Sequence, residues 1–411
     1  MTLDEKKNAY AALIVKAGGR VRPGQKVFLR CPVECYEFGR LVARKAYEAG
    51  ASEVDTEWQD LYLSRMRLDY APMEVFTHCP EWTALKLNTY AQSDVVFISL
   101  RGADPEIFKG VDPAKQAAEM RAMHEPLKVY HKMLTTMGFK WTIAGVPTTG
   151  WARKVYPMIN EQVAVTRLWD AIFETVRIGD GDAYGKWMAH AENLAGRCAA
   201  MTAWQFKTLR YESANGTDFT VGLAEHHRFE GGADRDPADG GPFFANMPTE
   251  EVFTMPDCRV AEGTLVASMP LSWQGCLIED FRLVFHEGAV VDYDARRGKE
   301  TLRRLLESDE GSRRLGECAL VPYPSPVSAQ GILFYNTLFD ENAACHFALG
   351  QCYETNIEGG PEMTEEELKA HGGNVSMNHV DFMVGTADLK ITGTRADGEE
   401  VVVFQNGTWA F

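Results

Sequence analysis

The sequence predicts an α/β N-terminal domain, with a parallel sheet flanked by helices, followed by a mainly antiparallel α+β C-terminal domain. Two observations support this fold class. Helix and strand patterns alternate over the first ~150 residues, and strands separated by helices usually pair in parallel. After Lys207 the pattern changes to strands joined by tight turns, which is typical of antiparallel pairing. We expect the two domains to cover residues 1–180 and 181–411.

The N-terminal half contains the elements of a parallel sheet in order. An amphipathic helix ends at Gly18-Gly19 and a second helix ends at Gly50, as helices commonly do. The β-rich runs are "GQKVFLRC", "SEVDTEW", "SDVVFISLRG" and "KWTIAGVPT", and a further helical stretch covers residues 113–137. No GxGxxG follows the first strand and no GxxxxGK[ST] occurs anywhere, so a nucleotide-binding function has little support.

Two long helical stretches, residues 157–178 and 182–207, connect the halves. The C-terminal half then begins with "LRYESANGTDFTVGL", which is typical of a hairpin with an Asn-Gly turn. Further strands are expected in "GTLVASMPLSW" and "CLIEDFRLVFHEGAVVDYDARRG", with later turns at Asp397-Gly398 and Asn406-Gly407. The segment 230–243 is rich in Gly, Asp and Pro, and we expect it to be a surface loop.

Composition indicates a globular protein and excludes several functions. The chain has 411 residues, 45% of them apolar, and a formal net charge of -16. An acidic chain lacks the clustered Lys and Arg of a nucleic-acid interface. No segment approaches the ~20 apolar residues that span a bilayer, and the N-terminus does not resemble a signal peptide. The nine cysteines are scattered without CxxC spacing, which favours reduced thiols and a cytoplasmic location.

Four segments of the C-terminal half contain residue types that bind metals or transfer protons. They are "NMPTEEVF", "LGECALVP", "NTLFDENAACHFALGQCYE" and "MNHVDFMVG", and they supply Glu250, Glu251, Glu317, His346, Tyr353, His379 and Asp381. Taken singly, each has an ordinary structural explanation. A glutamate at the start of a strand is usually solvated, and a histidine in an apolar segment is usually a hydrogen-bonded core residue.

His379 and Asp381 form the most informative pair. Residues i and i+2 of a strand point to the same side, so the imidazole and the carboxylate should project together. Val380, Phe382 and Val384 would then face the core. The pattern fits either a shared site or two polar residues on a solvated face.

As a set, these carboxylates and imidazoles suit Zn²⁺, Co²⁺ or Mn²⁺, and the surplus of carboxylates suits two ions that share a bridging group. Two ions ~3.5–4 Å apart are the arrangement that aminopeptidases and phosphatases use to activate water. Cys345 could in principle supply a thiolate, but on a strand it would point away from its neighbour His346. A core thiol is the better interpretation.

The segments "NMPTEEVFTMPD", "GECALVPYPSPVS", "YNTLFDENAACHFALGQCY" and "NHVDFMVG" occur in an order and spacing that resemble the M29 family of metallo-aminopeptidases. The likeness covers essentially the whole chain. It implies two divalent ions (Zn²⁺ or Co²⁺, with Mn²⁺ and Mg²⁺ as further candidates), peptide substrates and a homodimer. The implied metal ligands are Glu251, Glu317, His346, His379 and Asp381, with Glu317 bridging.

The resemblance also implies that Tyr353 is the catalytic tyrosine, which could donate a hydrogen bond to the tetrahedral oxyanion. Either residue of Glu250-Glu251 could be the ligand, and the resemblance favours Glu251 because family members often carry glycine at the preceding position. Either carboxylate, Glu250 or Glu251, could accept the proton of the attacking water.

Two other functions remain open at this level. His346, His379 and Asp381 alone would make a two-histidine, one-carboxylate site for a single Fe(II), as in ring-cleaving dioxygenases. A protein that has lost activity and binds a small ligand in the α/β half is the other alternative. Both leave the additional carboxylates Glu251 and Glu317 without a role.

Overall fold

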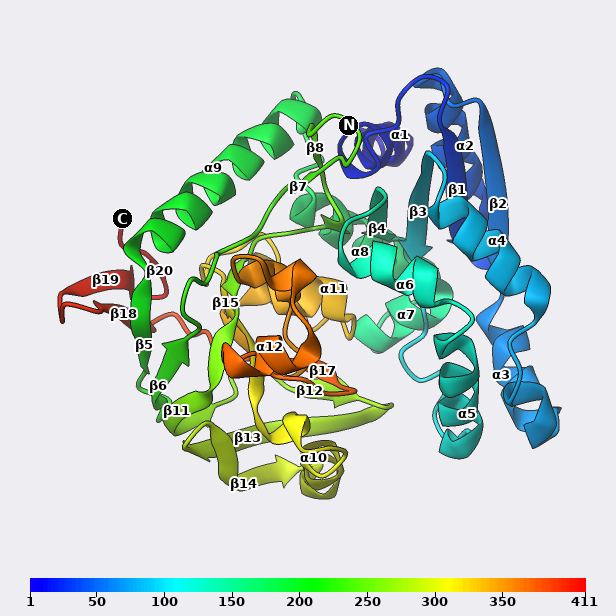
Figure 1. Ribbon diagram of the computed structural model, residues 1–411. Helices are drawn as coiled ribbons and strands as arrows, with labels where there is room; N and C mark the ends of the chain where they lie inside the picture. The colour runs from blue at the N-terminus through cyan, green and yellow to red at the C-terminus, as the bar shows by residue number, and fades with distance from the viewer. The chain divides into compact units, whose positions relative to one another are not determined.

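A five-stranded parallel sheet forms the centre of the first of two structural units in this computed structural model, which describes all of residues 1–411 (Figure 1). This unit comprises Met1–Ala189 and Ala233–Pro248. The strand order is β2-β1-β3-β4-β9. The strands are β1 (Lys26–Pro32), β2 (Glu53–Gln59), β3 (Val95–Arg101), β4 (Trp141–Gly145) and β9 (Asn246–Met247). All four pairings are parallel, as the alternation of helices and strands predicts.

Helices cover both faces of this sheet (Figure 1). They are α1 (Leu3–Leu13), α2 (Tyr36–Glu48), α3 (Leu61–Tyr70), α4 (Glu81–Ala91), α5 (Pro113–His124), α6 (Lys128–Thr135), α7 (Thr149–Val155) and α8 (Glu161–Thr175). On one face, Phe28 and Phe97 pack with Leu87 of α4 and with side chains of α6. On the other, Tyr10 of α1 stacks on Phe38 of α2. Because both faces are covered, β1 and β3 are largely buried apolar runs, whereas the edge strand β2 is polar and only partly buried.

The helices differ in two places from the sequence prediction. The stretch 113–137 is two helices, α5 and α6, instead of one. Helices α3 and α4 lie between strands where the sequence pattern indicates none. Their weak amphipathic pattern explains this, because Tyr70, Trp82 and Leu85 are exposed apolar side chains on helices whose buried face is narrow.

The segment 230–243 is more than a surface loop. It contains the short paired strands β7 (Asp234–Arg235) and β8 (Pro242–Phe243). Asp236 is 2% exposed and accepts from Arg20 at 2.8 Å and Lys140 at 3.0 Å. A buried carboxylate is retained only with such partners, and they hold this segment in the first unit although its neighbours along the chain belong to the second.

The second unit, His190–Gly232 with Thr249–Phe411, is built from antiparallel strands. Helix α9 (Ala183–Trp204) leads into it along the chain. A nine-stranded sheet has the order β12-β13-β11-β6-β5-β18-β19-β20, with β14 on β13. Its strands are β5 (Phe206–Glu212), β6 (Asp218–Leu223), β11 (Pro256–Val266), β12 (Leu271–Trp273), β13 (Cys276–His286), β14 (Ala289–Arg297), β18 (Lys390–Arg395), β19 (Glu400–Gln405) and β20 (Thr408–Trp409). The helices are α10 (Lys299–Leu306), α11 (Thr337–Asp340) and α12 (Glu365–Ala370).

A smaller sheet of the second unit has the order β10-β15-β16-β17. Its strands are β10 (Val252–Thr254), β15 (Leu315–Leu320), β16 (His346–Gly350) and β17 (His379–Met383), all antiparallel. One of its faces packs into the core of this unit through side chains such as Cys318, Phe347 and Phe382. The other face is free to carry polar groups. None of the helices in the chain combines the length and the apolar content that crossing a bilayer requires.

Candidate metal centre

The four-stranded sheet carries every metal ligand that the sequence suggests. Glu251 immediately precedes β10, Glu317 lies in β15, His346 begins β16, and β17 contributes His379 and Asp381. Neighbouring strands of this sheet thus come from segments that lie about 30 to 70 residues apart in the sequence. Since each strand alternates its side chains between the two faces, an apolar neighbour of each ligand enters the core on the opposite side.

The strand register explains why the ligands converge. Glu317 is paired with Ala348, and Ala348 is paired with Asp381, so these three residues lie in one row across three strands. The small methyl group of Ala348 leaves space between the two carboxylates. Behind this row, Phe382 and Val384 are 1% and 0% exposed, as expected from the alternation around His379 and Asp381, whereas Val380 packs against the core but is only partly buried.

The ligand atoms form two groups of three. Glu251, Glu317 and His346 make one group, and Glu317, His379 and Asp381 make the other, with the atoms of each group within 4.8 Å of one another. Glu317 belongs to both. The His346 Nε2 atom lies 3.2 Å from Glu251 Oε2, and the His379 Nε2 atom lies 3.0 Å from Glu317 Oε2 and 3.3 Å from Asp381 Oδ1.

Both imidazoles are oriented as metal ligands usually are. The Nδ1 atom of His346 is 3.1 Å from the Ala344 carbonyl oxygen, and that of His379 is 2.7 Å from the Gln351 carbonyl oxygen. A carbonyl only accepts, so each Nδ1 carries a hydrogen and donates it. Each Nε2 atom then faces carboxylate oxygens, and the positive charge between them is supplied either by a proton on the imidazole or by a metal ion that replaces it. The residues therefore fit a divalent metal ion.

The charged groups of the cluster shift one another's pKa values strongly. Burial lowers the pKa of His346, but Glu251, Asp381 and Glu317 outweigh it and raise that pKa to about 10. At His379 burial again lowers the pKa, but Asp381 and Glu317 outweigh it and raise the pKa to about 12. Burial raises the pKa of Glu317. The cluster thus concentrates negative charge in a site where cations are strongly favoured.

Cys345 is not part of this cluster. It is fully buried, and its thiol contacts the Val321 carbonyl oxygen within the core of the second unit. Burial raises the pKa of this thiol to about 12. The prediction that it points away from His346 into the core is confirmed.

Glu250 and Tyr353 have different surroundings. The Glu250 Oε2 atom is 3.5 Å from His190 Nε2, and no ligand group includes this residue. The Tyr353 ring lies 4.8 Å from that of His379, centroid to centroid. Burial, followed by the negative charges of Glu317 and Asp381, raises the pKa of Tyr353 well above its usual value, although 44% of the residue is exposed.

A further carboxylate, Glu341, adjoins the cluster and was missed by sequence reasoning. Burial and the nearby charges of Glu251 and Asp381 raise the pKa of Glu341 well above its usual value. Glu341 follows α11 directly and accepts a hydrogen bond from the Asn342 side chain at 3.4 Å. The sequence signal was weak because "FDEN" has the composition of an ordinary exposed turn.

Hydrogen bonds hold the segment before β17 in place. Asp309 accepts from the Ser376 hydroxyl at 2.9 Å and from the Met377 amide at 2.7 Å. The Gln351 side chain accepts from the Ser376 amide at 3.0 Å, and the Gln351 carbonyl accepts from His379. This network orients the imidazole of His379 before any ion is bound.

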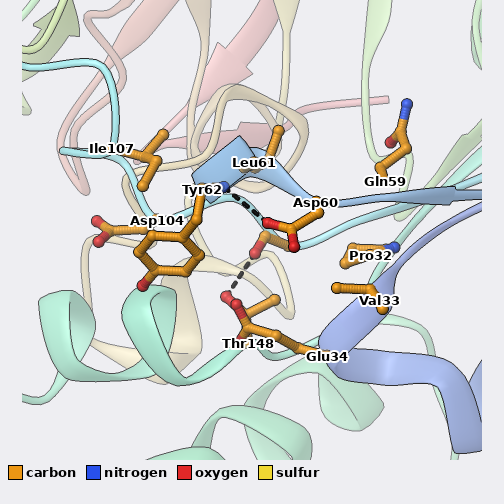
Figure 2. A pocket seen from close by; sticks show the side chains of 11 residues that line it. Pro32, Val33, Glu34, Gln59, Asp60, Leu61, Tyr62, Asp104, Ile107 and Thr148 are labelled. Atoms are coloured by element: carbon orange, nitrogen blue, oxygen red, sulfur yellow. Dashed lines mark hydrogen bonds between the residues drawn. The ribbon is translucent and has the colours of Figure 1, made fainter. Parts of the chain in front are cut away.

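A separate hollow lies at the carboxyl ends of the parallel strands of the first unit (Figure 2). It is lined by Glu34, Asp60 and Asp104 among others, and by no Lys or Arg. Asp60 accepts from the amide of Tyr62 at 3.0 Å, as Figure 2 shows. Its volume is only about 20 Å³, little more than one water molecule needs. This hollow suits neither a phosphate nor a small organic ligand.

This cluster of carboxylates and imidazoles, built on one sheet face, could hold divalent metal ions, as the centre of a metalloprotein would. The model of the family described as thermophilic metalloprotease (M29) matches residues 3–409. The chain belongs to this family, and it is therefore a hydrolase of the metallopeptidase class.

Its relatives are similar over their full length. The chain is 40% identical to "Aminopeptidase AmpS" of Bacillus subtilis, covering 100% of both chains, and 42% identical to "Aminopeptidase 2" of Geobacillus stearothermophilus, covering 99% and 98%. The solved structure of wild-type AmpT from Thermus thermophilus matches with a TM-score of 0.93 and 37% identity over 100% of both chains. The parallel N-terminal sheet and the antiparallel C-terminal sheets are shared with that structure.

A second solved structure shows a more distant likeness. The 2,5-dihydroxypyridine dioxygenase of Pseudomonas putida matches with a TM-score of 0.55 at 12% identity, over 100% of this chain and 98% of the other. At this identity the likeness concerns the fold alone.

Proposed function

We propose that the chain is an aminopeptidase that removes N-terminal residues from peptides, with broad specificity, using two divalent ions. The metallo-aminopeptidase class follows from the family and from relatives such as "Aminopeptidase AmpS". The observation that supports two ions is the sharing of Glu317 between two groups of three ligands. Oxygen and nitrogen ligands of this kind suit Zn²⁺ or Co²⁺, and also Mn²⁺ or Mg²⁺.

In this proposal Glu251 and His346 hold one ion, His379 and Asp381 hold the other, and Glu317 bridges them. Bound ions would lower the pKa of a water molecule to near neutrality and polarise the scissile carbonyl. The backbone acceptors of His346 and His379 keep each Nε2 atom directed into the site. The excess of carboxylates also attracts the protonated amine of a peptide, which would restrict cleavage to the first residue.

Tyr353 is proposed to bind the oxyanion that forms during attack. A tyrosine phenol, with an ordinary pKa of about 10, carries its proton at neutral pH and can donate a hydrogen bond, and the surroundings of Tyr353 raise its pKa further. A donor of this kind contributes ~10²–10³ in rate. The position of its ring beside that of His379 supports this role.

A carboxylate must also take the proton of the attacking water and return it to the leaving amine. Sequence reasoning suggests Glu250, or Glu251 in its place. We favour Glu341, because the charges of Glu251, Asp381 and Glu317 act on its carboxyl, whereas Glu250 lies 3.5 Å from His190.

Two further parts of the proposal are a homodimer, which rests on the family resemblance, and a cytoplasmic location, which rests on the scattered cysteines. Sedimentation of the purified protein would measure the first, and fractionation of the source cells would measure the second.

The test is an assay of the metal-loaded protein on Leu-, Arg- and Glu-p-nitroanilide. We expect wild-type activity on more than one substrate, two ions per chain, and a fall in kcat/KM of at least about a hundredfold for Glu317→Gln and His379→Ala. His286→Ala, which alters an exposed histidine paired with Glu262, serves as a control and should retain activity.

Two outcomes would contradict the proposal. Unchanged activity in both ligand variants would exclude this site. One oxygen-sensitive iron per chain, without peptidase activity, would favour the mononuclear dioxygenase alternative instead.

A further inference from the structure

A groove adjoins the metal ligands on the outer side of β17, the last strand of the four-stranded sheet. Its volume is about 260 Å³, and it is lined by Leu271, Ser272, Trp273, Thr337 and the run Met377–Asp381. Two of the lining residues, His379 and Asp381, are themselves proposed ligands. The groove is therefore only about one residue away from the scissile bond of a peptide bound at the ions.

The wall opposite β17 is a tight hairpin. Strand β12 lies against β17 and pairs with β13 through Trp273 and Cys276. The two turn residues, Gln274 and Gly275, both have positive φ angles of 48° and 73°, as a type I′ hairpin turn requires. Trp273 also packs against the core of the second unit, so the wall is held in place.

The chemistry of the groove favours an uncharged side chain. Trp273, Val380 and Leu271 offer apolar surface, and Met377, which is 80% exposed, stands at the rim. The rest of the lining is polar, and Ser272, Thr337 and Asn378 contribute uncharged groups to it. No Lys or Arg lines the groove, so an acidic side chain finds no counter-charge there. Its single carboxylate, Asp381, is a proposed metal ligand, so a basic side chain gains little there.

The size of the groove indicates what it receives. Pockets for whole small molecules are usually ~300–1,000 Å³, so 260 Å³ suits one large side chain better than several residues of a peptide. Flexible methionine at the rim can adjust to side chains of different shape.

We propose that this groove binds the side chain of the substrate's N-terminal residue, and that Trp273 and Met377 determine the preference for apolar residues such as Leu, Met and Phe over Ala, Glu and Lys. The inference rests on the proposed aminopeptidase function. It adds the part of the molecule that discriminates between substrates.

The test compares kcat/KM of the metal-loaded protein on the dipeptides Leu-Ala, Ala-Ala and Lys-Ala. We expect Trp273→Ala to lower the Leu-Ala to Ala-Ala ratio about tenfold, because apolar contact with the first side chain is lost. Met377→Glu, at an exposed position that should tolerate it, should raise the Lys-Ala to Leu-Ala ratio up to about fivefold. Trp82→Ala, which alters a tryptophan of α4 that is 71% exposed, should leave both ratios unchanged.

The reverse peptides Ala-Leu and Ala-Lys complete the design. Unchanged Leu-Ala to Ala-Ala and Lys-Ala to Leu-Ala ratios in both groove variants would overturn the inference while leaving the aminopeptidase function intact. A response confined to the reverse peptides would also overturn it, since the groove would then receive the second residue. A wild-type protein inactive on every peptide would instead contradict the proposed function itself.

Discussion

At the scale of single residues, Glu250 and Glu251 show how neighbouring glutamates acquire different surroundings. Successive residues of an extended chain point to opposite sides. Glu251 accordingly lies with Glu317 and His346, and Glu250 lies 3.5 Å from His190. Residue type alone does not show which of the two glutamates joins the ligand group, whereas the direction of each side chain does.

Glu341→Gln tests the proposed proton acceptor. We expect kcat to fall ~10²–10⁴-fold, because a positioned general base is lost, while the number of bound ions stays the same. Metal analysis of the purified variant together with steady-state kinetics measures both quantities. The matched variant Glu250→Gln should retain most of its activity. Equal losses in the two variants would contradict the assignment to Glu341.

At the scale of elements, β15, β16 and β17 bring the ligands into register, and the turn before His346 supports them from one end. Asp340, at the end of α11, is 6% exposed. It accepts from the Phe334 amide at 2.8 Å and the Asn336 amide at 2.9 Å, which closes the turn between residues 334 and 340. Burial raises the pKa of Asp340 to about 7 in spite of these bonds.

This raised pKa predicts a pH-dependent stability. Between about pH 4 and 7 the unfolded chain has lost the Asp340 proton while the folded chain still holds it. The contribution of Asp340 to the free energy of unfolding is therefore present below pH 4. It falls by ~1.4 kcal/mol per pH unit up to pH 7, and then stays constant. Asp340→Asn resembles the protonated form and should remove this loss.

The measurement is the difference in Tm between Asp340→Asn and the wild type from pH 5 to pH 8, with metal removed so that ion binding adds no pH dependence of its own. The variant should become progressively more stable than the wild type as the pH rises. A Tm difference that does not change with pH would show that Asp340 is ionised throughout this range.

At the scale of the whole molecule, the chain leaves the first unit, returns to it at Ala233–Pro248 and then continues to the ligand Glu251. A sequence-based division into residues 1–180 and 181–411 treats both halves as continuous. The returning segment is joined to the first unit by β9 on β4 and by the ion pairs of Asp236 with Arg20 and Lys140. Lys140 is 3% exposed, so each of these charges depends on the other.

Asp236→Asn should therefore destabilise the protein by ~3 kcal/mol or more, because the Lys140 charge remains buried without its carboxylate. For a unit of about 200 residues this corresponds to a fall in Tm of roughly 5–10 °C. Asp239→Asn is the matched control, since Asp239 pairs with Arg20 at 2.6 Å but is 39% exposed. Its Tm should change little. Similar losses in both variants would contradict the importance of burial at Asp236.

Much of the fold could be predicted because its signals are local. The alternation of helices and strands predicts the parallel sheet, and the alternation around His379 predicts which side chains enter the core. Helices α3 and α4 could not be predicted, because exposed Trp82 and Leu85 obscure their periodicity. The buried state of Asp236 could not be predicted either, because its partners lie more than 90 residues away in the sequence.

The sequence by itself determined the fold class, the family resemblance and the types of residue available to hold metal ions, because these depend on composition, periodicity and motif order. Only the tertiary structure decided which of those residues meet. The register that aligns Glu317, Ala348 and Asp381, the position of Glu341 and the groove beside β17 all arise from contacts between distant segments. Pairing between strands is set by packing of the whole unit, and no single segment specifies it.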